Sequence, residues 1–239
     1  MRKEGVIMKV KNKEMYHIHR NGVYDDIWQV GNEVIVDEDF ITLFNSDRDI
    51  PSGVRCKDGS ICSLDKFIEK VIKGLDTDEK ILDLKNLSDE DFLKKGKYLY
   101  YVLEDSMAKI RNLSLKNREE ALEAVRKEKY PKLPSRYHCI WVCNEENLDF
   151  WLSKLRKDSI IYKLELNGEL FKSSDSFLPE DGEKKENQKI EADKYWNPKF
   201  TDDDQERTAE YLFQGKVKIL EKLKWEKTAD KNIDMKLKP

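Results

Sequence analysis

Apolar and polar residues alternate in a short stretch near the N-terminus and again in the last third of the chain. Glu14–Arg20 alternates so that His17 and His19 would lie on one side of an extended segment. Four later stretches combine β-branched and aromatic residues, which favours strands: Ile27–Val36, Tyr137–Cys143, Ser159–Glu165 and Ala209–Ile219. Asn167-Gly168 predicts a hairpin turn after one of these strands.

The middle of the chain has the longer hydrophobic period of helices. Ser63, Ser88 and Ser114 each precede such a run, and a serine there can accept hydrogen bonds from the unpaired amides of a first turn. They predict three helices: Leu64–Gly74, Ser88–Arg111 and Leu115–Lys129. Two shorter helical segments are expected further on: Glu145–Leu155 and Glu191–Trp196.

These elements predict a single α+β domain over residues 14–220. It would contain an N-terminal strand, a helical middle and a C-terminal, mostly antiparallel sheet. We expect residues 1–13 to be a loose leader and residues 221–239, which are rich in lysine, to form a charged tail.

Composition narrows the class of protein. The chain has 239 residues, of which 38% are hydrophobic, so it can bury a sizeable core even though 39% are charged. With 45 Lys plus Arg and 48 Asp plus Glu, the formal net charge is −3, so no global basic field would attract a polyanion. No apolar run is long enough for a membrane span, and the N-terminus lacks the apolar core of a secretory signal. We therefore expect a cytoplasmic protein.

The cysteines and histidines do not predict a metal site. The four cysteines are separated by spacings that differ from the usual C-x2-C pair of zinc sites: Cys56, Cys62, Cys139 and Cys143. In a reducing compartment they would be thiols, and the last two would be small hydrophobic groups in a buried strand. The chain also lacks a G-x-G-x-x-G motif and a phosphate-binding loop, which disfavours a dinucleotide-binding dehydrogenase and a P-loop NTPase.

Several short motifs follow one another along the chain. In order they are Tyr16-His17-Ile18-His19-Arg20, Trp28-Gln29-Val30-Gly31, Tyr130-Pro131-Lys132-Leu133-Pro134-Ser135-Arg136, Cys139-Ile140-Trp141-Val142, Ala192-Asp193-Lys194-Tyr195-Trp196 and Ala209-Glu210-Tyr211. This order resembles a bacterial group of ADP-ribosyltransferase-like proteins, related to phage-defence and toxin–antitoxin transferases. The resemblance extends from Tyr16 to Ile219. It implies a split, mostly antiparallel sheet with a helical segment between its N-terminal and C-terminal strands.

The resemblance also implies a reaction. The substrate would be NAD, and the bond broken would be the one between nicotinamide and ribose. Glu210 matches the group's catalytic carboxylate, which stabilises the positive charge that develops on the ribose. His17 matches a contact to the ribose or nicotinamide, since a neutral imidazole can both donate and accept a hydrogen bond. His19 lies on the same side of the strand and is the alternative to His17.

Other residues would line the NAD site. The resemblance places the cofactor contacts at Tyr16, Arg20, Ser135, Arg136 and Tyr195. A guanidinium group can bind a pyrophosphate through two parallel hydrogen bonds, which suits the two arginines. If this assignment is right, the Glu210 carboxylate should face His17 across a cleft, with Ser135 nearby.

Two functional alternatives follow. The first is a mono-ADP-ribosyltransferase, the toxin of a toxin–antitoxin pair or a phage-defence effector. Its acceptor would be RNA, DNA or protein, and its partner would be an antitoxin protein. The second is a binding module that keeps the same fold and has lost catalysis. Release of nicotinamide from NAD would distinguish them.

Overall fold

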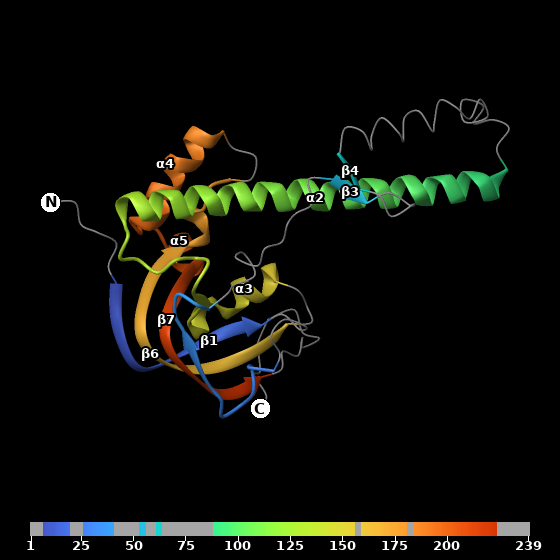
Figure 1. Ribbon diagram of the computed structural model, residues 1–239. Helices are drawn as coiled ribbons and strands as arrows, with labels where there is room; N and C mark the ends of the chain where they lie inside the picture. Colours follow the sequence, from blue (N-terminus) through green and yellow to red (C-terminus); the bar gives the residue numbers. More distant parts are fainter. Residues whose placement is uncertain are drawn as a thin grey trace. The chain divides into compact units, whose positions relative to one another are not determined.

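The computed structural model describes residues 7–19, 26–40, 53–55, 61–63, 88–155, 159–180 and 184–223 (Figure 1). The chain divides into two compact units. The first contains residues 1–46 and 118–239, and the second contains residues 47–117. The sequence, by contrast, predicts a single domain over residues 14–220. The expected helix Leu64–Gly74, Arg20 and the tail beyond Leu223 lie outside the described residues.

A five-stranded antiparallel sheet forms the body of the first unit. The strands are β1 (Ile7–His19), β2 (Glu33–Val36), β5 (Ile140–Val142), β6 (Ile160–Ser174) and β7 (Ala209–Leu223). Their order is β1-β6-β7-β2, and β5 pairs with β7 on the same edge as β2. The prediction of an α+β fold with a mostly antiparallel sheet is confirmed at this level.

β1 begins earlier than the sequence predicts. Residues 7–10 already pair with β6, from Ile7 opposite Phe171 to Val10 opposite Gly168. The expectation of a loose leader over residues 1–13 is therefore wrong for residues 7–13. A bulge between Val10 and Lys13 shifts the register of the pairing with β6. Most residues of β1 before Met15 are exposed to solvent, so this part of β1 forms an exposed edge of the sheet.

The sheet curls until β1 meets the residue that follows β5. β5 pairs with β7 on one side, and on the other side Tyr16 of β1 and Cys143, just after β5, exchange two backbone hydrogen bonds of 2.9 Å. The strands β1, β6, β7 and β5 thus close a ring. Figure 1 shows the strong curvature of β1, β6 and β7.

β6 runs straight through the predicted hairpin turn. Gly168 lies opposite Gly215 of β7, and a Cβ atom on Gly168 would lie 2.2 Å from the backbone oxygen of Gln214. Asn167-Gly168 is therefore a point of close strand approach in a bent sheet, and the hairpin prediction is wrong. A glycine in the sequence is compatible with a hairpin turn and with a close approach of two strands, because both need a residue without a Cβ.

The described part of the chain also contains helices. They are α2 (Asp89–Lys129), η1 (Glu145–Asn147), α3 (Leu148–Lys154), η2 (Asp175–Phe177), α4 (Lys185–Trp196) and α5 (Asp203–Arg207). α2 is one helix of 41 residues where the sequence predicts two, so the proposed cap at Ser114 is wrong. No proline or glycine lies between Arg111 and Leu115, so nothing in the backbone chemistry ends the helix there.

The second unit is described only in part. β3 (Gly53–Arg55) and β4 (Ile61–Ser63) form a two-stranded antiparallel sheet. Ser63, predicted as a helix cap, is the last residue of β4.

The two faces of the ring carry separate cores. On one face, residues from all four ring strands meet in a single cluster that includes Met15, Ile140, Leu164, Leu166, Phe213 and Val217. We call this the inner face. The other face packs against the end of α2 and against α4 through Leu122, Val125, Phe171, Ala192, Trp196 and Leu212. We call this the helix-covered face, and α3 covers its remainder at Ile161 and Leu148.

No helix in the described part of the chain combines the length and the apolar character needed to cross a membrane.

The close approach of the strands at Gly168 allows the curvature of the sheet to be tested by substitution. Gly168→Ala should lower the free energy of unfolding by roughly 2–4 kcal/mol, because its Cβ would meet backbone atoms that cannot rotate away. Chemical denaturation measures this. Gly31→Ala is the control: Gly31 has a φ of 91° and nothing within 4 Å of the added Cβ, so only backbone strain of roughly 1–2 kcal/mol is expected. Equal or smaller losses at Gly168 would contradict the close approach.

Candidate functional site

A buried arginine organises the helix-covered face. Arg136 follows α2 and is 4% exposed. Its guanidinium donates from Nε to Glu119 at 2.7 Å and from Nη2 to the other oxygen of the same carboxylate at 3.2 Å. Its Nη1 donates to Glu210 at 2.6 Å and also to the Tyr195 hydroxyl. One side chain therefore joins α2, α4 and β7.

Tyr195 completes this network. Its hydroxyl donates to the same Glu210 oxygen that Arg136 contacts, and its ring lies 4.9 Å from the guanidinium carbon. Burial and the Glu210 carboxylate raise the pKa of Tyr195 well above its ordinary value, with Arg136 opposing them. The phenol thus stays protonated as a donor. Burial alone would lower the pKa of Arg136, but Glu119, Tyr195 and Glu210 raise it well above its ordinary value.

A second acid on α2 holds the segment before Arg136. Glu123, one helical turn after Glu119, accepts two hydrogen bonds from Arg126, at 2.9 and 2.8 Å, and one from the Ser135 hydroxyl at 3.0 Å. Burial alone would raise the pKa of Glu123, but these hydrogen bonds and the arginine charge lower it. Together Glu119 and Glu123 anchor residues 135–136 to the end of α2.

The structure therefore brings four of the predicted site residues into one region. Arg136, Tyr195 and Glu210 are in direct contact, and Ser135 is the neighbour of Arg136. All four are less than 9% exposed. The guanidinium donors already point at protein acceptors, so a pyrophosphate at Arg136 would have to compete with two buried carboxylates.

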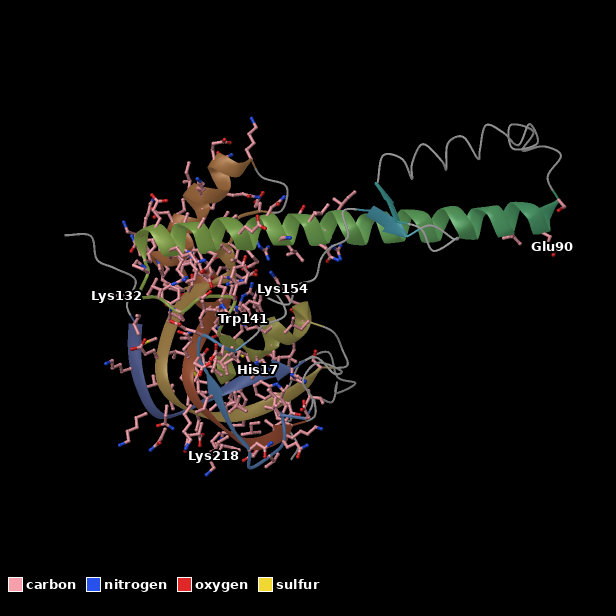
Figure 2. All side chains as sticks on the ribbon, in the orientation of Figure 1. His17, Glu90, Lys132, Trp141, Lys154 and Lys218 are labelled. Carbon is pink, nitrogen blue, oxygen red and sulfur yellow. The ribbon has the colours of Figure 1, made fainter. Side chains whose placement is uncertain are left out.

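His17 lies elsewhere, on the inner face. It stands opposite Tyr162 in the β1–β6 register, and its ring stacks on Trp28 at 4.4 Å between centroids. Nδ1 is 2.8 Å from the backbone carbonyl oxygen of Trp141, so Nδ1 carries the hydrogen and Nε2 is an acceptor. Nε2 has no hydrogen-bond partner among the described residues. Figure 2 labels His17 and Trp141 in this part of the sheet.

The environment keeps His17 neutral. Burial lowers its pKa to about 4, and the nearby His19 acts in the same direction, whereas the hydrogen bond to Trp141 opposes both. His19 is 6% exposed and lies 5.4 Å from the Trp28 ring and 5.9 Å from the Tyr162 ring. His17 is the more exposed of the two histidines, which favours it over His19 as a ligand contact.

The expected pairing of Glu210 with His17 is not present. Glu210 stands opposite Ser173 and is bound on the helix-covered face, whereas His17 is on the inner face. Adjacent residues of a strand point to opposite faces, so the neighbours of Glu210, Ala209 and Tyr211, belong to the inner-face cluster. The expectation that Glu210 faces His17 across a cleft is therefore wrong. Tyr16 also points away from His17 and packs against the α3 cluster.

Sequence reasoning missed several residues that build this region. Glu119 and Glu123 were part of an ordinary amphipathic helix pattern, although their spacing of four places both acids on one side of α2. Asn147 was also missed. Its amide donates to the backbone oxygens of Glu206 and Arg207, at 2.8 and 2.9 Å, and so holds the segment that leads into β7.

The thiols and the acids do not gather into a metal site in the described part of the chain. Cys139 and Cys143 are free and buried, and burial raises the pKa of the Cys143 thiol to about 12. Among the described residues there is no group of three or more histidine, cysteine or acidic side chains that could hold a metal ion.

Comparison with known proteins places the chain in a family without assigning it an activity. A family model described as "Protein of unknown function (DUF2441)" matches residues 15–225, most of the chain, so the protein belongs to the DUF2441 family. No curated protein matches the sequence.

The lowered pKa of His17 predicts a pH dependence of stability. Between pH 4 and 6.5 the unfolded chain binds a proton at this histidine and the folded chain does not. The free energy of unfolding should thus fall as the pH drops from 6.5 toward 4, by at most about 3 kcal/mol. His17→Asn should flatten this slope in denaturant titrations, and His138→Asn controls for the loss of a histidine bonded to a backbone carbonyl. An unchanged slope in His17→Asn would contradict the neutral state of this imidazole.

The arginine network predicts a large loss of stability. Arg136→Met removes the partner of two buried carboxylates and should cost roughly 3–5 kcal/mol in thermal or chemical unfolding. Arg207→Met removes an exposed pair with Asp204 and should cost less than about 1 kcal/mol. A small effect at Arg136 would mean that its ion pairs do not hold the helices to the sheet.

Proposed function

We propose that this chain is an NAD-dependent mono-ADP-ribosyltransferase that binds NAD on the inner face beside His17. The observation that carries the proposal is the state of that imidazole: half-buried, neutral, fixed by its Nδ1–H bond to Trp141, and with Nε2 facing no protein donor among the described residues. Such a nitrogen can accept a hydrogen bond from a ribose hydroxyl or a carboxamide. The ordered motifs from Tyr16 to Glu210 and the antiparallel α+β fold agree with this reading.

The proposed reaction is a substitution at the C1′ carbon of the nicotinamide ribose. The bond to nicotinamide breaks, nicotinamide leaves with the bonding electrons, and a nucleophile of the acceptor forms the new bond. The proton of that nucleophile passes to a base. A carboxylate close to the ribose would stabilise the positive charge that develops there, and Glu210 is the candidate for this role.

A second candidate is a nucleotide-binding module without catalysis. The observation that favours it is the position of Glu210, which is 5% exposed, bonded to Arg136 and Tyr195, and on the opposite face from His17. For Glu210 to reach a ribose held by His17, this network would have to open. The catalytic proposal therefore requires a rearrangement at the start of β7 that the binding proposal does not.

The biological setting is part of the proposal. A transferase of this kind would act in the cytoplasm as a toxin or a phage-defence effector, on RNA, DNA or protein, with an antitoxin protein as a partner. A nucleic-acid acceptor would need local basic surface, since the net charge of the chain is −3. Mass spectrometry of nucleic acids and proteins from cells that briefly express the chain would reveal an added ADP-ribose.

Two matched variants test whether Glu210 is catalytic. Glu210→Gln and Glu119→Gln each remove one of the two carboxylates that pair with Arg136. If Glu210 stabilises the transition state, Glu210→Gln should lower nicotinamide release from NAD by about 100-fold or more, whereas Glu119→Gln should retain activity within a few-fold.

The outcomes separate the two functions. Equal losses in both variants would assign Glu210 a structural role within the ion-pair network. Binding of NAD by the wild-type protein with no nicotinamide release and no transfer to cell extract would reject the transferase and leave the binding module.

A further inference from the structure

The register of the ring strands places three polar side chains, those of Lys172, Tyr211 and His17, in one row on the inner face, with the buried Val142 between the last two. Lys172 of β6 stands opposite Tyr211 of β7, and Tyr211 stands opposite Val142 of β5. Tyr16 and Cys143 form an isolated antiparallel bridge, so Val142 and His17, the residues next to them on β5 and β1, lie side by side. Lys172, Tyr211, Val142 and His17 therefore follow one another across four strands. We call them the inner row.

Lys172 lies at one end of this row, beside two aromatic rings. Its Nζ is 4.3 Å from the centroid of the Phe200 ring and 6.0 Å from that of Tyr211. Its side chain is 26% exposed, so the ammonium group is held in place and still reaches solvent. The rings shield the lysine stem and fix its direction.

The charge partner of Lys172 is weakly held. The ammonium pairs with Glu206 of α5, whose side chain is 52% exposed. An ion pair with such an exposed carboxylate contributes little to stability, because water and salt screen it. A ligand with two negative charges can displace one carboxylate at a lysine, since the ammonium gains more from the denser charge.

We propose that Lys172 binds the diphosphate of a nucleotide on the inner row, with Tyr211 beside it and His17 at the far end, and that Glu206 occupies the diphosphate position when the ligand is absent. The ligand class is a nucleoside diphosphate or a dinucleotide that contains one. This inference rests on the proposed function for the identity of the ligand. It replaces Arg136 as the phosphate contact, because the donors of Arg136 are engaged by buried acids.

The chain offers a closely matched control for Lys172. Lys163 lies on the same strand, is 25% exposed and pairs with one partly exposed carboxylate, that of Glu14, at 2.8 Å. It differs in its face, because Lys163 stands opposite Tyr16 and Glu221 on the helix-covered side of β6. Lys172→Met and Lys163→Met therefore remove the same charge at the same exposure from opposite faces.

The test is calorimetric titration with ADP, with adenosine as the ligand that lacks phosphate. Lys172→Met should weaken ADP binding about tenfold or more, and Lys163→Met less than about twofold. Adenosine affinity should be the same in both variants. Glu206→Gln should tighten ADP binding about threefold or more, since the ligand no longer competes with a carboxylate. That gain is not expected if Lys172 and Glu206 form only a surface ion pair.

Each outcome decides the inference. No ADP binding by the wild-type protein, equal effects of the two lysine variants, or unchanged affinity in Glu206→Gln would overturn it. Nicotinamide release by the wild-type protein is measured separately. Release without a Lys172 effect on ADP would retain the transferase and reject the inner row as the diphosphate site. Lys172-dependent ADP binding without release would retain the inner row and reject the transferase.

Discussion

The first unit depends on one buried guanidinium. Arg136 reaches Glu119 on α2, Tyr195 on α4 and Glu210 on β7, so three elements distant in sequence meet at a single side chain. Its planar fork allows this, since Nε and Nη2 bind one carboxylate in parallel while Nη1 is directed elsewhere. A lysine has no such geometry. Because the charges are buried, loss of one partner leaves another buried group without its charge partner, which makes this contact between the helices and the sheet costly to break.

The same network separates the two faces of the ring. It draws Glu210, Arg136 and Tyr195 to the helix-covered face, and the alternation along β7 then turns Tyr211 toward the inner face. The close approach of Gly168 and Gly215 bends β6 and β7 and lets β5 bridge β7 and β1. As a result His17, Tyr211 and Lys172 share the inner face of the ring. The candidate chemistry is thus distributed over two faces, with a buried, hydrogen-bonded acid on one and a neutral imidazole on the other.

Family membership does not choose between the proposed activities, since DUF2441 is defined without a function. The choice rests on physical differences between the faces. A carboxylate held by an arginine and a tyrosine is suited to fixing β7. A half-buried imidazole whose Nε2 meets no donor in the described part of the chain, in a row with a half-buried lysine, is suited to contacting a polar ligand. The transferase and the binding module share this ligand face and differ only in whether Glu210 leaves its network.

The sequence by itself determined the local elements with a clear period. The strand around His17, the strand after Arg136, the strand that begins at Ala209 and the helical middle all follow from side-chain alternation and caps. Only the tertiary structure decided the role of Gly168, the continuity of α2 and the residues that Glu210 contacts. A glycine signals a turn or a close approach equally well, and the buried partners of Arg136 come from residues as much as 74 positions away. Local patterns carry no information about such distant pairs, because the strands meet only when the whole sheet curls.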